Sequence, residues 1–351
     1  MSTKTNTGNF FEDFEIGMEL IHATPRTVTE GDVALYCGLF GMRFALNSSE
    51  TFAQNLGLPG APIDDFLVFH IVFGKTVPDI SLNAVANLGY AGGVFAAPVY
   101  PGDTLSARSQ VIGLKENSNG KTGVVYVRST GHNQRGEMVL DYVRWVMVLK
   151  RDPGSPAPVS IVPELPGAVE AADLIMPSLR NFDDYKSELS GSAAFWGDYA
   201  VGERIDHVDG MTIEDAEHMI ATRLYQNTAK VHFNQHVQQD GRFGKRLIYG
   251  GHIISLARGL SFNGLANAFK IAAINGGAHT NPTFAGDTIY AWSEVLDKMD
   301  LPGQDRIGAL RLRTIACKDQ SCAEFPDKGA DGKHLPSVVL DLDYTVLTIK
   351  R

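Results

Sequence analysis

FFEDFEIG, residues 10–17, returns as FWGDYAVG at residues 195–202, and this repetition is the main clue to how the chain is organised. A second pair of segments has nearly the same spacing: PVYPGDTL at 98–105 is answered by PTFAGDTI at 282–289. The offsets are 185 residues (10 to 195) and 184 residues (98 to 282). Segments that repeat at one spacing predict two copies of a single folding unit.

The ends of the two copies are also alike. VLDYVRWVMVLKR at 139–151 resembles VLDLDYTVLTIKR at 339–351, and the larger offset of 200 residues (139 to 339) predicts an insertion around residues 318–335. Between the copies, residues 151–177 contain 6 of the 16 prolines, a density that disfavours both helix and sheet. We therefore expect three parts: a first unit at 1–150, a Pro-rich linker at 151–190 and a second unit at 191–351.

Each copy predicts two helices in the same order. A threonine precedes the first helix, Thr29 before residues 30–41 and Thr212 before residues 213–227, and acidic residues follow it in the first turn. Threonine is a common helix N-cap, and the helix dipole favours acidic residues there. The second helix, at 63–77 or at 250–265, is apolar nearly all round and must therefore be buried.

Three strands follow the helices in each copy. The last strand of the chain alternates clearly: its apolar set is Val338, Leu340, Leu342, Tyr344 and Val346, and its polar set is Asp341, Asp343 and Thr345. Such alternation is typical of a half-buried antiparallel strand. The expected strands are 104–114, 121–130, 137–150, 288–296, 307–316 and 337–349. A buried helix followed by strands predicts an α+β unit in which a sheet wraps around a helix.

The composition excludes several classes of protein. The chain has 351 residues, of which 44% are hydrophobic and 20% charged, as in ordinary globular proteins. A net charge of −9 argues against a nucleic-acid or anionic-membrane binder. The longest apolar run, residues 66–74, is too short to span a bilayer, and three cysteines are too few for a disulfide framework. We expect a cytoplasmic protein without a membrane anchor or a nucleic-acid partner.

Common nucleotide and hydrolase motifs are absent from the sequence. QDGRFGKR at 239–246 has neither the first glycine nor the Ser/Thr of a phosphate-binding loop, and no GxSxG occurs. The glycines of LGYAGGVF at 88–95 do not form GxGxxG. Kinase, dinucleotide-dependent oxidoreductase and α/β-hydrolase functions are therefore not indicated.

The densest group of reactive side chains is YQNTAKVHFNQH, residues 225–236. His232 and His236 have the spacing of a zinc-binding pair, but Phe233 replaces the glutamate of HExxH, so we expect no metal site. These residues are either a solvated polar loop or the position of a general acid/base, for which histidine is suited near neutral pH.

The residues of both copies resemble the MaoC-like hotdog dehydratases over essentially the whole chain. That family's motif, Gly-Asp-x-Asn-Pro-x-His, aligns with QNTAKVH at 226–232, and its helix-head glycine aligns with Gly250, beside Gly251. The resemblance implies an α+β double hotdog fold, with His232 as the catalytic histidine and Asn227 at the position of the catalytic aspartate. In the first copy, GMRFALN at 41–47 places Met42 and Asn47 at these positions, so that copy is expected to be inactive.

The resemblance also implies an activity: reversible hydration of a branched, carboxylate-bearing enoyl-CoA, with the acyl-CoA as substrate, no cofactor, and a homodimer or higher homo-oligomer. Removal of the proton α to a thioester builds negative charge on the thioester oxygen, which N–H groups of Gly250 and Gly251 at a helix N-terminus would stabilise. The asparagine at 227 leaves two alternatives. Either His232 carries proton transfer alone, or a carboxylate from Asp64 or Asp65 replaces the aspartate.

Cations are needed for the substrate carboxylate and the CoA phosphates. Lys230 and Arg43 lie within the two motif loops and are the preferred candidates, with Tyr225 as a further substrate contact and with Arg223 and Arg258 nearby. Each of these charges has an ordinary alternative role as a solvated or structural group. Three other functions stay open: a different (R)-specific enoyl-CoA hydratase, a hotdog thioesterase, and an acyl-CoA binding protein with a degenerate site.

Overall fold

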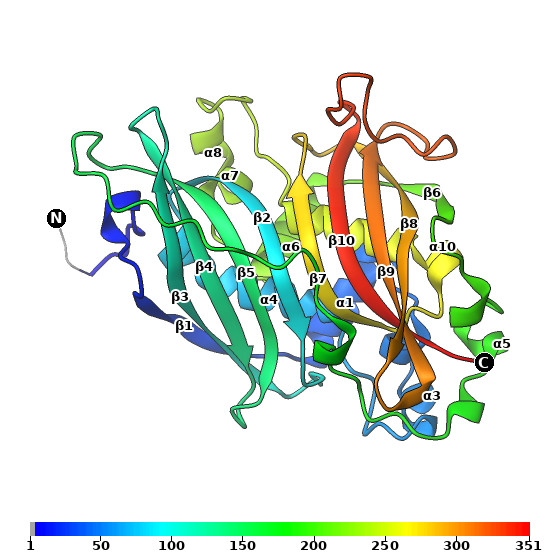
Figure 1. The fold of residues 1–351 in the computed structure, drawn as a ribbon. Helices are drawn as coiled ribbons and strands as arrows, with labels where there is room; N and C mark the ends of the chain where they lie inside the picture. Colours follow the sequence, from blue (N-terminus) through cyan, green and yellow to red (C-terminus); the bar gives the residue numbers. More distant parts are fainter. Residues whose placement is uncertain (1–3) are drawn as a thin grey trace.

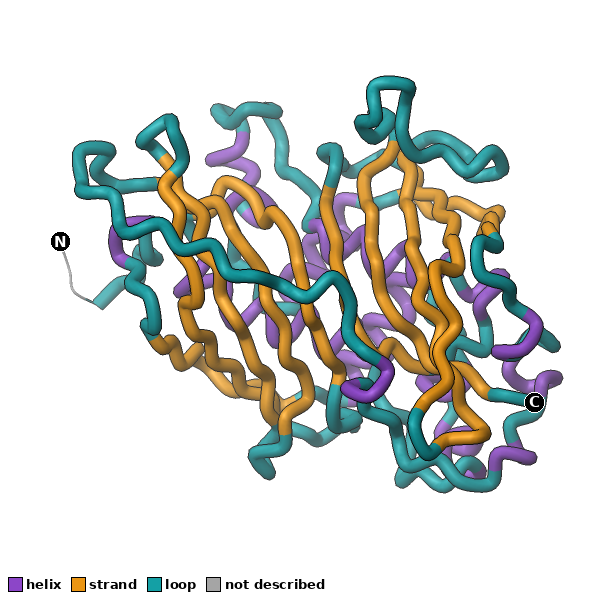
Figure 2. Tube along the Cα trace, in the orientation of Figure 1, coloured by secondary structure: helices purple, strands orange, loops and turns teal. Residues whose placement is uncertain are grey.

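The computed structural model describes residues 4–351, and the strands in this part of the chain form one antiparallel sheet (Figures 1 and 2). The strand order is β1-β3-β4-β5-β2-β7-β10-β9-β8-β6. The strands are β1 (Glu19–Thr27), β2 (Ala84–Phe95), β3 (Thr104–Glu116), β4 (Thr122–His132), β5 (Met138–Leu149), β6 (Arg204–Thr212), β7 (Lys270–His279), β8 (Thr288–Leu301), β9 (Gln304–Lys318) and β10 (Val338–Ile349). The first five strands in sequence thus form one half of the sheet and the last five form the other.

The main helices lie together on one face of this sheet (Figure 1). All α-helices of residues 4–351 are α1 (Glu30–Phe40), α2 (Ala45–Ser48), α3 (Glu50–Asn55), α4 (Asp65–Thr76), α5 (Ser187–Ser190), α6 (Asp215–Leu224), α7 (Lys230–Phe233), α8 (Gln235–Gln238), α9 (Gly250–Leu260) and α10 (Phe262–Leu265). A π-helical turn at Val77–Ser81 follows α4, and 3-10 turns lie at Phe11–Asp13, Ala171–Asp173, Phe182–Asp184 and Trp196–Asp198.

The halves are related by an internal pseudo-two-fold arrangement. β2 is the last strand of one half-sheet and β7 is the first strand of the other. They pair antiparallel, with Tyr90 opposite Gly277, and so join the two half-sheets. Against this seam, α4 meets α9, where His70 Nε2 lies 2.8 Å from the hydroxyl of Ser255. Since residues 70 and 255 are 185 apart, the offset seen in the sequence is also the offset between symmetry-related positions. The predicted α+β double hotdog is confirmed.

The apolar character of α4 and α9 explains their central place. Every residue of α4 from Phe66 to Thr76 is buried, as are the residues of α9 from Gly251 to Leu260. Burial of such side chains contributes about 1.5–3 kcal/mol each relative to exposure. The prediction that both helices are buried is confirmed.

Two expectations about local structure are wrong. Thr29 caps α1 as predicted, in a capping box with Asp32, but Thr212 caps nothing: it is the last residue of β6, and α6 begins three residues later with Glu214 as N-cap. In β10, Thr345 is fully buried rather than exposed. Its hydroxyl accepts a hydrogen bond from Asn275, whose side chain also binds the backbone of Val169, so this face of the strand is covered.

The connection between the halves provides that cover. It crosses the face of the sheet opposite to the helices (Figure 2). Ile161 pairs with Leu114 of β3 in an isolated bridge, and Val169 N–H donates to Asn275 of β7. The segment is therefore fixed against both halves of the sheet.

No helix within residues 4–351 is long and apolar enough to cross a membrane.

Candidate active site

The arrangement around His232 fixes the tautomer of this histidine. His232 lies in the single turn α7, and its Nδ1 is 2.8 Å from the carbonyl oxygen of Leu247. Because a carbonyl can only accept, Nδ1 carries the proton and Nε2 is left with a free lone pair. Burial lowers the pKa of His232 to about 4, against the effect of the Leu247 hydrogen bond. The imidazole is therefore neutral at pH 7 and can act as a base through Nε2.

The first turn of α9 lies next to this histidine. The ring of His232 is 5.6 Å from that of Tyr249, the N-cap residue of α9. The side chain of Tyr249 does not cap this helix end, and its backbone N–H donates to Nε2 of His218. Backbone N–H groups in the first turn have no partner inside the helix. Those of Gly250 and Gly251 are therefore suited to an anionic oxygen.

Glycine is required at both positions for steric reasons. A Cβ at Gly250 would lie 2.4 Å from the ring of His279, and a Cβ at Gly251 would lie 2.5 Å from the ring of His70. Any side chain would force these rings away and would also block close approach of a ligand to the N–H groups.

His279 is a neighbour of the helix head that sequence reasoning missed. It is the last residue of β7, its Nε2 is 3.3 Å from the hydroxyl of Tyr90 in β2, and burial together with His232 lowers its pKa to about 4. One signal was available: NGGAH at 275–279 repeats AGGVF at 91–95 with the same offset of 184, so His279 replaces Phe95 of the first copy. Tyr90 shows that the first half contributes to this site.

Asn227 lies at a cavity of about 430 Å³, named here the Asn227 cavity. Its walls come from both halves of the chain and include Thr24, Lys75, Pro78, Arg223, Asn227 and Phe233. The side-chain oxygen of Asn227 accepts a hydrogen bond from Ala229 N–H (3.1 Å), which shapes the turn leading into α7. Asn227 is thus placed on the same short loop as His232.

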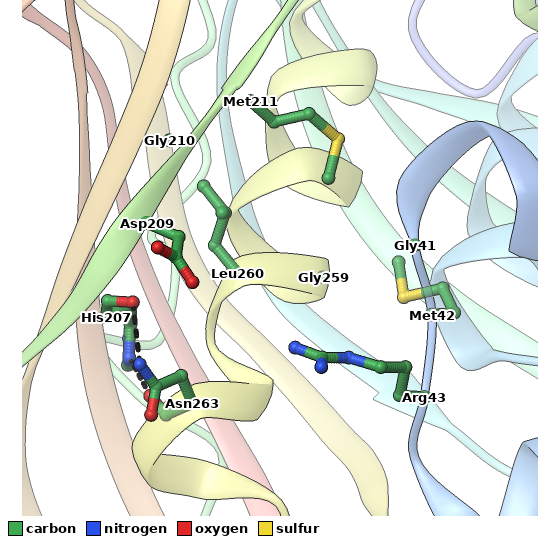
Figure 3. A pocket seen from close by; sticks show the side chains of 10 residues that line it. All are labelled: Gly41, Met42, Arg43, His207, Asp209, Gly210, Met211, Gly259, Leu260 and Asn263. Atoms are coloured by element: carbon green, nitrogen blue, oxygen red, sulfur yellow. Dashed lines mark hydrogen bonds between the residues drawn. The ribbon is translucent and has the colours of Figure 1, made fainter.

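A second cavity of about 330 Å³ lies at the symmetry-related position and is likewise lined by both halves of the chain (Figure 3). This Met42 pocket lies between the strand carrying His207 to Met211 and the loop carrying Gly41 to Arg43, with Leu260 from α9. At both cavities a glycine of a central helix lies against the backbone of the facing segment. A Cβ at Gly74 of α4 would lie 1.8 Å from the Tyr225 carbonyl oxygen, and a Cβ at Gly259 of α9 would lie 2.1 Å from the Phe40 carbonyl oxygen. Arg43 belongs to this pocket, on the copy that lacks the motif residues.

Asp64 and Asp65 have structural roles at the head of α4. Asp65 forms an ion pair with Lys270 (2.8 Å) and accepts from the backbone of Ile271. Asp64 caps α4 through Phe66 N–H, and burial raises its pKa to about 6, opposed by the charge of Arg258. Asp64 is thus near Arg258, which is eight residues from Gly250, about 12 Å along α9. Asp64 and Asp65 therefore lie at the opposite end of the helix pair from His232.

The remaining predicted contacts are dispersed. Tyr225 is in the core, with its ring 4.6 Å from that of His70, and Arg258 is buried with its guanidinium 3.3 Å over the ring of Phe44. Lys230 is exposed on α7, and Arg223 is exposed at the rim of the Asn227 cavity. The structure therefore brings His232, Gly250 and Gly251 together. Tyr225 lies beside this helix head, with its ring 6.1 Å from that of Tyr249. Arg258 lies at the other end of α9 and Arg43 lies in the Met42 pocket.

Potential metal ligands gather elsewhere. Among the described residues, one oxygen or nitrogen each from Asp327, His334 and Asp341 lies within 4.8 Å of the others. Arg313 already binds both carboxylates, at 2.6 and 2.8 Å. This group is best understood as an ion-pair network that fixes the insertion after β9 to the sheet. His236 is exposed on α8, and Nδ1 of His232 already donates a hydrogen bond to the carbonyl oxygen of Leu247.

Comparisons with known proteins show the family of the chain. The family model for mesaconyl-CoA hydratase matches residues 1–326. A β-methylmalyl-CoA dehydratase of Chloroflexus aurantiacus is 67% identical over 351 residues, covering 100% of both chains, and a mesaconyl-CoA hydratase of Cereibacter sphaeroides is 62% identical over 346 residues, covering 98% of this chain and 99% of the relative. The crystal structure of a MaoC domain protein dehydratase from Chloroflexus aurantiacus superposes with a TM-score of 0.98 at 67% identity, with 100% of both chains covered. The chain belongs to the mesaconyl-CoA hydratase family.

Proposed function

We propose that this protein catalyses the reversible hydration of mesaconyl-CoA to β-methylmalyl-CoA. The observation that carries the proposal is the pairing of a neutral histidine, His232, with the uncapped N-terminus of α9. The family and the names of the two relatives supply the substrate.

The chemistry follows from these two features. Addition of water across the double bond of an enoyl thioester places negative charge on the thioester oxygen before the α carbon is protonated. The N–H groups of Gly250 and Gly251, aided by the helix dipole, stabilise this charge. His232 Nε2 accepts a proton from the attacking water and returns a proton in the same site. In the reverse direction the imidazolium assists departure of the hydroxyl group.

We further propose that His232 carries proton transfer alone. Asn227 has no ionisable group, and its amide can only orient a water or hydroxyl by hydrogen bonding. Asp64 and Asp65 are engaged at the other end of the helix pair, where Asp64 caps α4 and Asp65 binds Lys270. This supports the first of the two alternatives that the sequence left open.

The reaction proposed here uses side chains and backbone groups only, without a resident cofactor or metal. We also propose a homodimer or larger homo-oligomer, by analogy with hotdog proteins, and a cytoplasmic location, which the free thiols of Cys37, Cys317 and Cys322 support.

The test is to replace His232 with alanine and to follow loss of the enoyl-thioester absorbance of mesaconyl-CoA. We expect turnover to fall at least ~100-fold, because a positioned acid/base contributes roughly 10²–10⁴-fold. His236→Ala is the matched control: this histidine is exposed four residues further on, and its variant should retain the native rate.

Free thiol is measured in the same reaction. Thiol release without hydration by the native protein would identify a thioesterase, and binding without either change would identify an acyl-CoA binding protein. A native rate in His232→Ala would remove the histidine from the mechanism.

A further inference from the structure

We propose that Lys75 and Asn227 together form the subsite for the free carboxylate of the substrate, and so select dicarboxylic over neutral acyl-CoA thioesters. The inference rests on the proposed function and identifies the residues that select the substrate class of the proposed reaction.

Lys75 is a buried cation, and the part of the chain that the structure describes gives it no anionic partner. It lies near the end of α4 with 2% of its surface exposed, and it lines the Asn227 cavity. Its ammonium donates to the backbone carbonyl of Thr24. Among residues 4–351 no carboxylate forms an ion pair with it, whereas the neighbouring Arg26 is paired with Asp32 at 2.5 Å. An ammonium has three donors, so further donors stay available to a ligand.

A lysine in this state is costly unless it binds something. Burying an ammonium without a counter-charge is strongly unfavourable. Burial, with a smaller effect of Arg26, lowers the pKa of Lys75 to about 8, so the group is still mainly protonated at pH 7. A carboxylate entering the cavity would supply the missing counter-charge and a short charge-assisted hydrogen bond.

Asn227 lies against the helix that carries Lys75. A Cβ placed at Gly74 would be 1.8 Å from the Tyr225 carbonyl oxygen and 3.4 Å from the backbone nitrogen of Asn227. The backbone of α4 therefore contacts the backbone of the loop that carries Asn227. The buried amide of Asn227 adds hydrogen-bonding capacity without charge. An aspartate here would neutralise Lys75 and repel a second carboxylate. The departure from the family motif at 227 thus has a physical reason.

The position of the carboxylate in the substrate agrees with a subsite next to His232. In β-methylmalyl-CoA the hydroxyl group and the free carboxylate are attached to the same carbon. The groups that handle the water must therefore lie next to the groups that bind the carboxylate. Asn227 and His232 share one short loop, which allows one end of the site to do both.

The Met42 pocket provides an internal comparison. With the offset of 185, Lys75 corresponds to Leu260 and Asn227 to Met42, and both of these apolar residues line that pocket (Figure 3). The same backbone arrangement, with Gly259 against the carbonyl of Phe40, is thus built without a lysine. The fold does not require the cation at position 75, which leaves ligand binding as its role.

The experiment measures binding by calorimetry, independently of turnover. The probes are methylsuccinyl-CoA, which has the carboxylate, and 2-methylbutyryl-CoA, which has a methyl group instead. The native protein should prefer methylsuccinyl-CoA by about 10- to 100-fold, in line with a hydrogen bond to a charged group. Lys75→Met should lose this preference while binding 2-methylbutyryl-CoA as before. Lys115→Met removes the same charge from an exposed site on β3 and should keep the preference.

Asn227→Asp is the second variant, and it should bind methylsuccinyl-CoA about 10-fold more weakly with little change for 2-methylbutyryl-CoA. A preference that survives in Lys75→Met, or tighter methylsuccinyl-CoA binding by Asn227→Asp, overturns the subsite. Selective binding by a native protein that does not hydrate mesaconyl-CoA would instead refute the proposed function and leave the subsite standing. Thermal unfolding of each variant establishes that it is folded.

Discussion

At the scale of single residues, histidines that are neutral in the folded chain make the protein sensitive to acid. Burial lowers the pKa to about 4 in His207, His232 and His279, to about 3 in His252 and to about 2 in His218. In the unfolded chain these groups take up protons near pH 6.5. The unfolded state therefore binds more protons below pH 6.5, and the free energy of unfolding must fall as the pH drops from 6.5 towards 4. Urea unfolding at pH 7, 6 and 5 measures this slope.

His252→Phe isolates one contribution to the slope. Neither ring nitrogen of His252 has a hydrogen-bond partner among residues 4–351, and the ring packs edge-on against Phe40 at 4.8 Å, so an apolar ring suits the site. The variant should lose about 1.4 kcal/mol per pH unit of the slope between pH 6.5 and about 4. An unchanged slope would mean that His252 is not neutral in the folded protein.

The sequence indicates some site residues and hides others for a physical reason. His232, Gly250 and Gly251 lie in one motif and at one helix head, so local pattern is sufficient to find them. Lys75 and His279 reach the site from α4 and β7 through tertiary packing. Lys75 occurs in an apolar helix, where a single basic residue near the C-terminal end is expected on grounds of the helix dipole alone.

At the scale of elements, periodicity finds the strands with ordinary side chains but not the strands that join the halves. The six expected strands all exist, whereas β1, β2, β6 and β7 were not predicted. In β2 and β7, glycines such as Gly92, Gly93, Gly276 and Gly277 interrupt the alternation. Glycine weakens a strand in isolation and permits close backbone approach, and here it serves the seam between the half-sheets.

The two central helices offer a paired test of how α4 positions the active loop. Gly74→Ala and Gly259→Ala each place a methyl group against a backbone carbonyl, at 1.8 Å from Tyr225 and 2.1 Å from Phe40. Alanine normally stabilises a helix by up to about 1 kcal/mol relative to glycine, but overpacking costs about 1–3 kcal/mol, so both variants should be destabilised.

Their effects on activity should differ. Gly74→Ala displaces the loop with Asn227 and His232, and we expect hydration of mesaconyl-CoA to fall by at least ~10-fold, as small misplacements at active sites do. Gly259→Ala displaces the loop of the Met42 pocket and should retain activity below its melting temperature. Equal losses in kcat for two variants of equal stability would argue against a special role of the α4 contact.

At the scale of the whole molecule, the two halves are alike in backbone and unlike in chemistry. The second half supplies His232 and the head of α9, while the first supplies Tyr90 beside His279 and Lys75 beside Asn227. The duplicated fold thus allows one half to lose its own motif, with Met42 and Asn47 in it, and to change into a wall of its neighbour's site.

This division of labour predicts what happens when the chain is cut between Pro156 and Ala157, in an exposed part of the connection. Either fragment alone would expose a seam strand and the buried face of α4 or α9, and such surfaces favour aggregation. Fragment 157–351 contains His232, Gly250 and Gly251 but lacks Tyr90 and Lys75, so it should not hydrate mesaconyl-CoA.

Co-expression of the two fragments should restore activity, because β2–β7 pairing and the contact of His70 with Ser255 need no covalent link. The measurement is co-purification through a tag on one fragment, followed by the hydration assay. Full activity in fragment 157–351 alone would show that the first half is dispensable for the site.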